Sequence, residues 1–324
     1  RDEFTTVKLL PRAKFFKSEA FSRMILSDEF DFDLVHFHLM WMTDKNTILS
    51  ALQEKNIPYM ITTHAAYTPD RIDSLKKDIS MRTLEKQYLF NAKAIHALCY
   101  EEKGFLRDLN IRSLIHVIPN GISRDEIIKI RSSDKLENPY SENHINLVWV
   151  GRIRDDKNVL GIVESLLHMD DEVKDKIRIH IVGNGIESYI QEVKATIKKH
   201  NLEENIILHG PKYKEEKYQY ILNADIYLQP SFSEGISFSI LDAMACAKPM
   251  VLTRQTNMTY YYNKNFYVMT EPYPEDIANA IKRLVNDETM CAELSKNAEQ
   301  LIVTTFNWDS LIKEYITMYK KVIG

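Results

Sequence analysis

The sequence has few cysteines, no long apolar run and no strong excess of charge. Its three cysteines, Cys99, Cys246 and Cys291, are far apart, which argues against a disulfide framework and favours a reducing compartment such as the cytoplasm. No stretch reaches the roughly 18 apolar residues of a membrane span, and the first ten residues lack the apolar core of a signal peptide. The 42 basic and 46 acidic side chains leave a net charge of −4. We therefore expect no nucleic-acid partner.

Motifs of several well-known active sites are also missing. The sequence contains no GxxxxGK[ST] phosphate loop, no GxSxG elbow, no HExxH pair and no CxxC pair. The glycine pair Gly183 and Gly185 lacks the third glycine of a dinucleotide fingerprint, because Ser188 stands in its place. Ten histidines are present, but none has the spacing of metal ligands. We predict no metal site and no bound cofactor.

The 324 residues favour two domains. Short apolar runs alternate with longer amphipathic stretches, which is typical of a parallel sheet wrapped by helices. The predicted strands cover 33–38, 58–63, 93–98, 114–118, 145–150, 177–182, 205–208, 225–229 and 250–253, and the main predicted helices cover 45–56, 70–91, 100–108 and the segments that begin at Pro274 and Asn307. A polar stretch at 132–144 is the best linker candidate.

The predicted fold is therefore α/β, with two Rossmann-like, doubly wound domains. Residues 1–140 would form the first domain and residues 141–324 the second. The final helix, at 307–321, would pack at the domain junction. Ligands of such sheets bind beyond the carboxyl ends of the strands. His64, Asn120, Gly151, Gly183 and the segment 230–234 all follow predicted strands, so we expect the two sheets to face each other across a cleft.

The segment 233–247 predicts an anion site beside a buried acid. A helix would begin near Ile236, and it is apolar almost all round. Its free N-terminal amides and its dipole suit a phosphate. Asp242 lies inside this helix and needs a partner, either a cation or ligand hydroxyls, and Glu234 precedes the helix. In the alternative interpretation, Glu234 caps the helix and Asp242 forms a structural ion pair.

A second candidate site follows the strand at 145–150. Gly151 ends the strand, Arg152 comes next and Lys157 follows five residues later. Two cations at one strand end could hold a diphosphate. The alternative is a solvated loop in which Arg152, Arg154 and Lys157 pair with Asp155 and Asp156.

These pieces occur in an order that resembles a known family. The segments are VHFH (35–38), TTHAAY (62–67), IPNGI (118–122), WVGRIRDDKN (149–158), IVGNG (181–185), LHGP (208–211) and ADIYLQPSFSEGISFSILDAMACAKP (224–249). Together they are similar to the retaining glycosyltransferases of family 4, also called group 1, which have the GT-B fold. The resemblance implies sugar transfer with retention and without a metal, from a nucleotide-diphosphate sugar, with UDP-sugars favoured over GDP-sugars.

The resemblance also assigns roles to individual residues. Arg152 and Lys157 look like the pair that neutralises the leaving diphosphate, Glu234 would face the donor sugar, and His64 would reach the transferred sugar. The implied catalytic residues are His64, Arg152, Lys157 and Glu234; the implied donor-binding residues are Gly151, Gly183, Gly210, Lys212, Gly235, Ile236, Ser237 and Asp242; Asn120 is a further site residue. By the resemblance, Asp242 binds the ribose hydroxyls.

The sequence departs from the family pattern in three places. Asp242 stands where the family has a glutamate, Ala65 and Ala66 follow His64 where an aspartate is common, and no glycine-rich loop precedes the strand at 33–38. We therefore expect a short or incomplete first domain. These departures keep two alternatives open: a non-catalytic GT-B protein that binds nucleotide sugars or acts as a scaffold, and a nucleotide-sugar epimerase.

The acceptor would be a glycan or a lipid-linked molecule. The basic, aromatic segment 12–26 could lie on the inner face of a membrane, or it could be a surface helix that covers the sheet. We expect a cytoplasmic protein with possible peripheral membrane contact through this domain.

Overall fold

The computed structural model describes residues 19–27, 31–38, 41, 45–69, 72, 74–132, 137–140 and 143–324. The chain divides into two compact units, Arg1–Val117 with Ile316–Gly324, and Ile118–Tyr315. This division lies before the predicted linker at 132–144. The reason is that residues just after Val117 pack on the second unit, as shown by the ion pair between Lys129 and Glu215.

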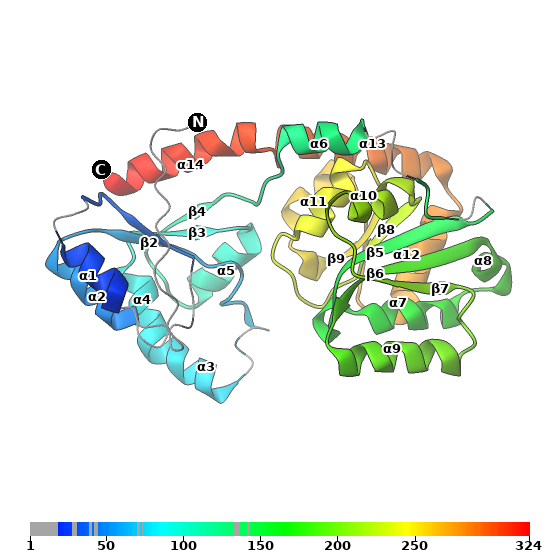
Figure 1. The fold of residues 1–324 in the computed structure, drawn as a ribbon, viewed down its shortest axis with the longest axis horizontal. Helices are drawn as coiled ribbons and strands as arrows, with labels where there is room; N and C mark the ends of the chain where they lie inside the picture. Colours follow the sequence, from blue (N-terminus) through cyan, green and yellow to red (C-terminus); the bar gives the residue numbers. More distant parts are fainter. Residues whose placement is uncertain are drawn as a thin grey trace. The chain divides into compact units, whose positions relative to one another are not determined.

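The first unit contains a parallel sheet with strand order β1-β2-β3-β4 (Figure 1). Its strands are β1 (Val35–Phe37), β2 (Tyr59–Thr62), β3 (Ala94–Ala97) and β4 (Leu114–Val117). Its helices are α1 (Glu19–Leu26), α2 (Lys45–Glu54), α3 (Leu75–Ser80), α4 (Lys86–Asn91) and α5 (Tyr100–Asp108). A π-helical turn, Met81–Glu85, joins α3 to α4, so the long predicted helix at 70–91 is helical from Leu75 onward.

The two faces of this sheet differ in character, because side chains alternate along each strand. One face is apolar, with Phe37, Ile61 and Ile95 in the core beneath the helices. The other face carries His36, Thr62 and His96, which are linked by hydrogen bonds. The hydroxyl of Tyr319, near the end of the chain, bonds to His36 Nδ1 at 2.8 Å. This polar face is therefore tied to the C-terminal segment.

The second unit contains six parallel strands in the order β10-β9-β8-β5-β6-β7. The strands are β5 (Ile145–Ile153), β6 (Ile177–Gly185), β7 (Ile206–Gly210), β8 (Ile226–Gln229), β9 (Met250–Thr253) and β10 (Val268–Thr270). The chain builds outward from β5 to β7 on one side and then from β8 to β10 on the other. The strand order thus reverses between β5 and β8, where open α/β sheets bind their ligands.

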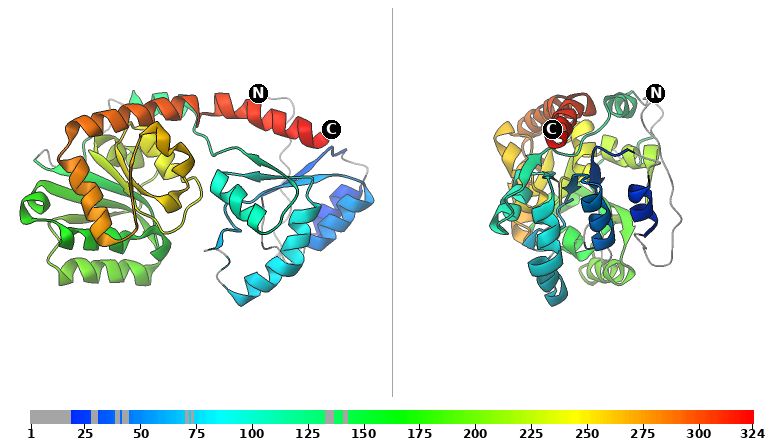
Figure 2. Two further views of the ribbon diagram at one scale, coloured as in Figure 1. Left: turned by 180° about the vertical axis from the view of Figure 1, so that it is seen from behind. Right: turned by 90° about the vertical axis from the view of Figure 1, so that its left-hand side faces the viewer.

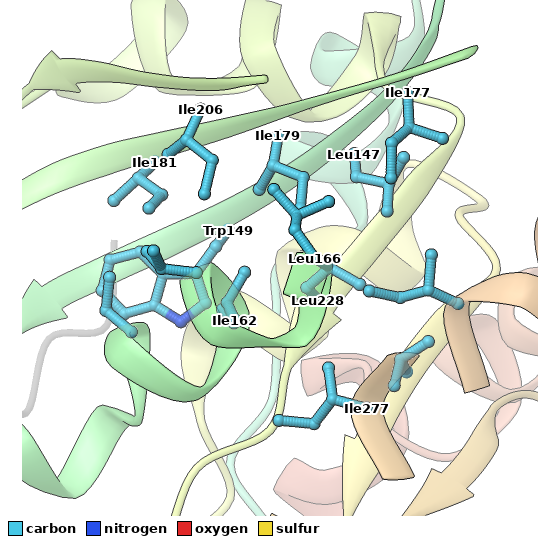
Figure 3. Packing of buried hydrophobic residues seen from close by; sticks show 14 of the residues in the cluster. Leu147, Trp149, Ile162, Leu166, Ile177, Ile179, Ile181, Ile206, Leu228 and Ile277 are labelled. Carbon is cyan, nitrogen blue, oxygen red and sulfur yellow. The ribbon is translucent and has the colours of Figure 1, made fainter. Parts of the chain in front are cut away.

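Helices cover both faces of this second sheet (Figure 1 and Figure 2). The helices that follow β4 are α6 (Arg124–Arg131), α7 (Val159–Ser165), α8 (Asp171–Lys176), α9 (Glu187–Lys199), α10 (Lys214–Asn223), α11 (Phe238–Ala245), α12 (Pro274–Val285), α13 (Glu288–Thr304) and α14 (Trp308–Ile323), with short 3-10 turns at Asp155–Lys157, Leu166–His168, Arg254–Thr256 and Thr259–Lys264. Helix α14 belongs to the second unit as far as Tyr315 and to the first unit from Ile316. Helices α7, α9 and α12 enclose the main core with the strands, and α11 lies against both α10 and α13. Figure 3 shows that Trp149, Ile162 and Ile181 meet in this core.

The predicted α/β fold with two parallel sheets is confirmed. Two predicted strands are longer than expected, because β5 and β6 remain paired as far as Ile153 and Gly185. The short strand β10 was not predicted. Residues 12–18 of the predicted basic segment 12–26 lie outside the described residues, and the rest of this segment forms α1. No helix in the described part of the chain is long and apolar enough to cross a membrane.

Candidate functional site

The reversal of strand order brings the two candidate segments of the second unit together. Residues Gly151 and Arg152 lie near the end of β5, and the loop 230–237 follows the neighbouring strand β8. The amide of Phe232 in this loop donates to the carbonyl of Asp156, at 2.9 Å. The segments around Lys157 and Glu234, 77 positions apart in the sequence, therefore form one site.

A buried ion pair lies at the centre of this site. Lys157 Nζ lies 2.8 Å from Glu234 Oε2, and the two side chains are only 11% and 9% exposed. The same ammonium donates to the carbonyl of Ser233 at 3.0 Å. The carboxylate of Asp156 lies 3.4 Å from it. The ion pairs of the alternative interpretation are therefore confirmed for Arg154 and Lys157, which both lie within ion-pair distance of Asp156. Lys157 is nevertheless buried and not solvated, and its shortest contact is with Glu234.

Neutral side chains hold Glu234 in place. Its Oε1 accepts hydrogen bonds from Gln229 at 2.7 Å and from Ser231 at 3.0 Å. The amide of Asn257 donates to the Glu234 carbonyl at 2.6 Å. A charged group held by several fixed partners keeps its orientation without reorganising when a ligand arrives. The site is therefore preorganised around this carboxylate.

The helix after this loop begins later than predicted. Ser237 is the N-cap and α11 starts at Phe238, not near Ile236. Phe238 is 60% exposed, whereas residues 240–245 are all buried, as the apolar pattern predicted. Asn120 lies beside this helix start, because its side-chain amide donates to the carbonyl of Ile236 at 2.9 Å. Gly235 lies between Glu234 and Ile236 in the loop.

Gly151, Arg152 and Gly183 lie within strands, not in the loops that the sequence predicted. Gly151 of β5 is paired with Gly183 of β6, and a Cβ at Gly183 would lie 1.9 Å from the Gly151 carbonyl oxygen. The absence of side chains therefore explains why the two strands stay paired this far. A Cβ at Gly151 would press on the ring of Trp149. Arg152 is exposed.

Asp242 is paired by the preceding helix. Its Oδ2 lies 2.5 Å from Lys217 Nζ, and its Oδ1 accepts from the Tyr218 hydroxyl at 3.0 Å. The same hydroxyl lies 2.8 Å from Glu126 Oε1. Burial raises the pKa of Asp242, although the charge of Lys217 opposes this. The cation partner that the sequence analysis required is thus Lys217, as in the structural alternative.

The remaining predicted residues of the second unit lie at the end of β7 and just after it. Gly210 has a left-handed backbone with φ +66°, a conformation that favours glycine. Lys212 forms an ion pair with Glu216 on α10 and lies over the ring of Tyr220. The side chain of Lys212 is therefore engaged by contacts within the protein.

His64 lies in the first unit, two residues after the end of β2, and it is exposed although its neighbours Thr63 and Ala65 are buried. Its backbone is left-handed, with φ +47°, and Ala65 follows with φ +56°. Such backbones cost about 1–3 kcal/mol each in residues other than glycine and cluster at functional sites. His64 Nε2 lies 3.0 Å from His38 Nδ1. Partial removal of the imidazole ring from water lowers the pKa of His64, although the residue as a whole is exposed, and a charge on nearby His38 adds to this effect.

The sequence analysis missed several residues of the second-unit site. Gln229, Ser231, Asn257, Lys217 and Tyr218 were not singled out. The first three are polar residues near strand ends, a position that could have marked them. Lys217 lies 25 residues from Asp242, and no local pattern links the two. Within the described residues, no group of three or more His, Cys, Asp or Glu side chains is placed to hold a metal ion.

Comparisons with known proteins agree with this architecture. Residues 131–301 match the family described as "Glycosyl transferases group 1", and residues 4–126 match "Glycosyltransferase Family 4". An uncharacterised glycosyltransferase of Methanocaldococcus jannaschii is 24% identical over 247 residues, which are 75% of this chain and 62% of that protein. This chain thus spans less than two thirds of that relative.

Two further proteins are similar over most of the chain. The putative teichuronic acid biosynthesis glycosyltransferase TuaC of Bacillus subtilis is 22% identical, with 89% of this chain and 71% of that protein covered. The crystal structure of HepE from Anabaena in complex with UDP has a TM-score of 0.76 at 17% identity, with 94% and 81% covered. The two parallel sheets match the GT-B fold of such structures, and the family match covers more than half of the sequence. This chain belongs to the group 1 glycosyltransferases.

Proposed function

We propose that this glycosyltransferase uses a nucleotide-diphosphate sugar, with UDP-sugars favoured, and transfers the sugar with retention of configuration and without a metal. The observation that carries the proposal is the buried Lys157–Glu234 pair at the reversal of strand order. The UDP complex of the similar Anabaena protein supports the choice of nucleotide. The assignment of TuaC to teichuronic acid biosynthesis supports a glycan acceptor, and a lipid-linked acceptor is the alternative.

Stabilisation of the leaving diphosphate would come from cations and backbone amides. Lys157 has three N–H groups. Two are within hydrogen-bond distance of Glu234 and Ser233. The Asp156 carboxylate lies 3.4 Å from the ammonium, so a phosphate oxygen would take the third N–H in place of this longer contact. Arg152 would supply a second, planar donor from the end of β5, and the amides of Gly235, Ile236 and Ser237 would add backbone donors. Preorganised donors of this kind contribute about 10²–10³-fold each to turnover.

Glu234 and Asp242 would bind hydroxyl groups of the donor. The carboxylate of Glu234 is fixed by Gln229 and Ser231, so it can accept a hydrogen bond from the donor sugar in a defined direction. Both oxygens of Asp242 already have protein partners. A carboxylate offers about four acceptor positions, so a ribose hydroxyl can be added without displacing Lys217 or Tyr218. The glycines at 151, 183 and 210 and the backbone at Lys212 would line the nucleotide.

We further propose a catalytic role for His64 and a supporting role for Asn120, which holds the loop at Ile236. The protein would act in the cytoplasm, where nucleotide sugars are made. Contact with the inner face of a membrane through the first unit would suit a lipid-linked acceptor.

A ligand panel tests the donor class. Purified protein is mixed with UDP-, GDP- and ADP-sugars, and the thermal midpoint is measured. A ligand present at 100 times its Kd stabilises the folded protein by about 2.7 kcal/mol, so the matching donor should raise the midpoint clearly. Arg152→Ala should reduce this shift. A panel in which no UDP-sugar shifts the midpoint, or in which the variant responds like the wild type, contradicts the proposal.

Product analysis tests the reaction. The released or transferred sugar is followed by NMR, with and without EDTA. The proposal predicts a product with the anomeric configuration of the donor and unchanged turnover in EDTA. Epimerised donor in the absence of acceptor would identify an epimerase. Binding of donor without hydrolysis, and without transfer to glycan or lipid-linked acceptors, would identify a non-catalytic protein.

A further inference from the structure

The first unit contains a buried carboxylate that the proposed reaction does not use. Glu102 lies in the first turn of α5 and is only 1% exposed. Within the described part of the chain, no lysine, arginine or histidine forms an ion pair with it. Burial raises the pKa of Glu102, and hydrogen bonds from Thr63, Leu98 and Ala65 oppose this shift. A buried acid without a cation is costly, so its contacts indicate what it does.

The contacts of Glu102 join the ends of two strands. Its Oε2 accepts from the amide of Leu98, after β3, at 2.7 Å. Its Oε1 accepts from the amide of Ala65, after β2, at 2.5 Å, and from the hydroxyl of Thr63. An acid at this position of a helix commonly bonds only to the start of its own helix. Here the second oxygen reaches across to the turn that carries His64.

That turn needs support. His64 and Ala65 both have left-handed backbones, and strained conformations persist only where the surroundings determine them. Thr63 and Ala65, on either side of His64, are buried, whereas His64 is exposed. Both of these buried neighbours bond to the same oxygen of Glu102. The carboxylate thus fixes the turn on both sides of the one residue that the turn exposes.

We propose that Glu102 is a positioning residue, whose buried carboxylate holds the turn that presents His64 for sugar transfer. This inference rests on the catalytic role proposed for His64. Glu102 does not touch the substrate and acts only through the turn. A glutamine at this position would keep the shape and one acceptor oxygen. Its NH₂ group would face either the Leu98 N–H or the Thr63 hydroxyl and the Ala65 N–H. In both orientations a donor faces a donor, and a hydrogen bond is lost.

The chain offers a matched control in Glu85. It is equally buried in the same unit, pairs with Lys45 and accepts from the Tyr67 hydroxyl at 2.6 Å. It makes no hydrogen bond to the 63–65 turn. Glu85→Gln should therefore destabilise the unit without acting on His64. This comparison separates loss of stability from loss of position.

The experiment follows the His64 ring by NMR in protein with ¹⁵N-labelled histidine, for the wild type, Glu102→Gln and Glu85→Gln. We expect the His64 ring signals to shift or broaden in Glu102→Gln only, and transfer kcat to fall about tenfold or more in this variant with a smaller change in donor KM. Unchanged His64 signals in Glu102→Gln, or equal changes in both variants, overturn the proposal. If Glu102→Gln does not fold, Thr63→Val, which removes one donor to the carboxylate, should change the His64 signals in the same direction.

A double variant shows whether Glu102 acts through His64. Glu102→Gln combined with His64→Ala should be no slower than His64→Ala alone. Multiplicative losses would show an independent effect and overturn the proposal. If His64→Ala keeps wild-type turnover, the catalytic role of His64 fails, and the NMR comparison still decides whether Glu102 positions the turn.

Discussion

Lys217 and Asp242 form an ion pair between neighbouring helices, with 2.5 Å between Nζ and Oδ2 and an Asp242 side chain that is only 8% exposed. Removal of one member of such a pair leaves the other charge buried without compensation. We therefore expect Lys217→Met to reduce the free energy of unfolding by about 3 kcal/mol, measured by urea denaturation. Lys214→Met, an exposed change on the same helix, should cost less than about 0.5 kcal/mol. Equal effects of the two variants would contradict this account of Asp242.

The two proposed phosphate-binding cations should respond differently to substitution. Arg152 is exposed, so Arg152→Ala should leave the free energy of unfolding within about 0.5 kcal/mol of wild type and lower turnover about 100-fold or more. Lys157→Ala should lower turnover as well, and it should also cost about 3–5 kcal/mol, because Glu234 stays buried without its cation. Steady-state kinetics and urea denaturation of each variant measure the two quantities.

Arg154→Ala is the control for both cation variants. Arg154 lies between them in sequence but pairs with Asp156, and we assign it no role in donor binding. Its removal should leave turnover within about twofold. A loss as large as that of Arg152→Ala would show that general positive charge matters there, and not the two assigned side chains.

Gly183→Ala should strongly destabilise the second unit. The new Cβ would lie 1.9 Å from the Gly151 carbonyl oxygen, so β5 and β6 would have to separate at their ends. We expect a loss of at least about 2 kcal/mol in the free energy of unfolding. Gly104→Ala, where the new Cβ meets no atom within 4 Å in the interior of α5, should instead stabilise by about 0.5–1 kcal/mol. Denaturation experiments should therefore show a lower free energy of unfolding for Gly183→Ala and a higher one for Gly104→Ala.

His180 should make the protein more sensitive to acid. Burial, with smaller contributions from His209 and Arg178, lowers its pKa to about 3. Its Nε2–H donates to Asn146 Oδ1, so its Nδ1 is the acceptor for His209 Nε2–H, and Nδ1 can take up a proton only if the bond from His209 is lost or His209 changes its tautomer. The unfolded chain binds this proton below about pH 6.5, but the folded chain does not until about pH 3. Stability is therefore lost as pH falls from about 6.5 toward 3.

The variant His180→Gln tests this dependence. Between pH 6 and pH 4, the wild type should lose up to about 1.4 kcal/mol per pH unit more than the variant, measured by urea denaturation at each pH. His168→Gln, at an exposed histidine, should follow the wild type. If the free energy of unfolding of His180→Gln depends on pH in the same way as that of the wild type, His180 has the same pKa in the folded and unfolded chains, and the prediction is wrong.

Local sequence patterns predicted helices and strands well where a segment is long enough to show a hydrophobic pattern of its own. The helix Tyr100–Asp108 and the strand Met250–Thr253 have the predicted bounds. The strand Val268–Thr270 has only three residues, too few for a periodic pattern. The ends of β5 and β6 were assigned to loops, because their glycines usually indicate turns but here allow two strands to approach closely.

The sequence marked some residues of the candidate site but not the partners that they contact. Residues at strand ends stood out, and the structure brings the segments of Lys157 and Glu234 together. The partner of Asp242 could not be identified, since Lys217 lies on another helix and is one of many lysines. The left-handed turn at His64 and its contact with Glu102 depend on two strands meeting in space, and sequence spacing carries no such information.

The packing of Trp149 beneath Gly151 gives the protein an optical reporter of its own. The chain has three tryptophans, and Trp149 is fully buried in the core (Figure 3), whereas Trp308 is 40% exposed. A buried indole emits at shorter wavelengths than a hydrated one. Trp149 lies two residues before the glycine whose Cβ would press on its ring and three before Arg152. Its fluorescence should therefore change when a ligand settles at the end of β5, without any label.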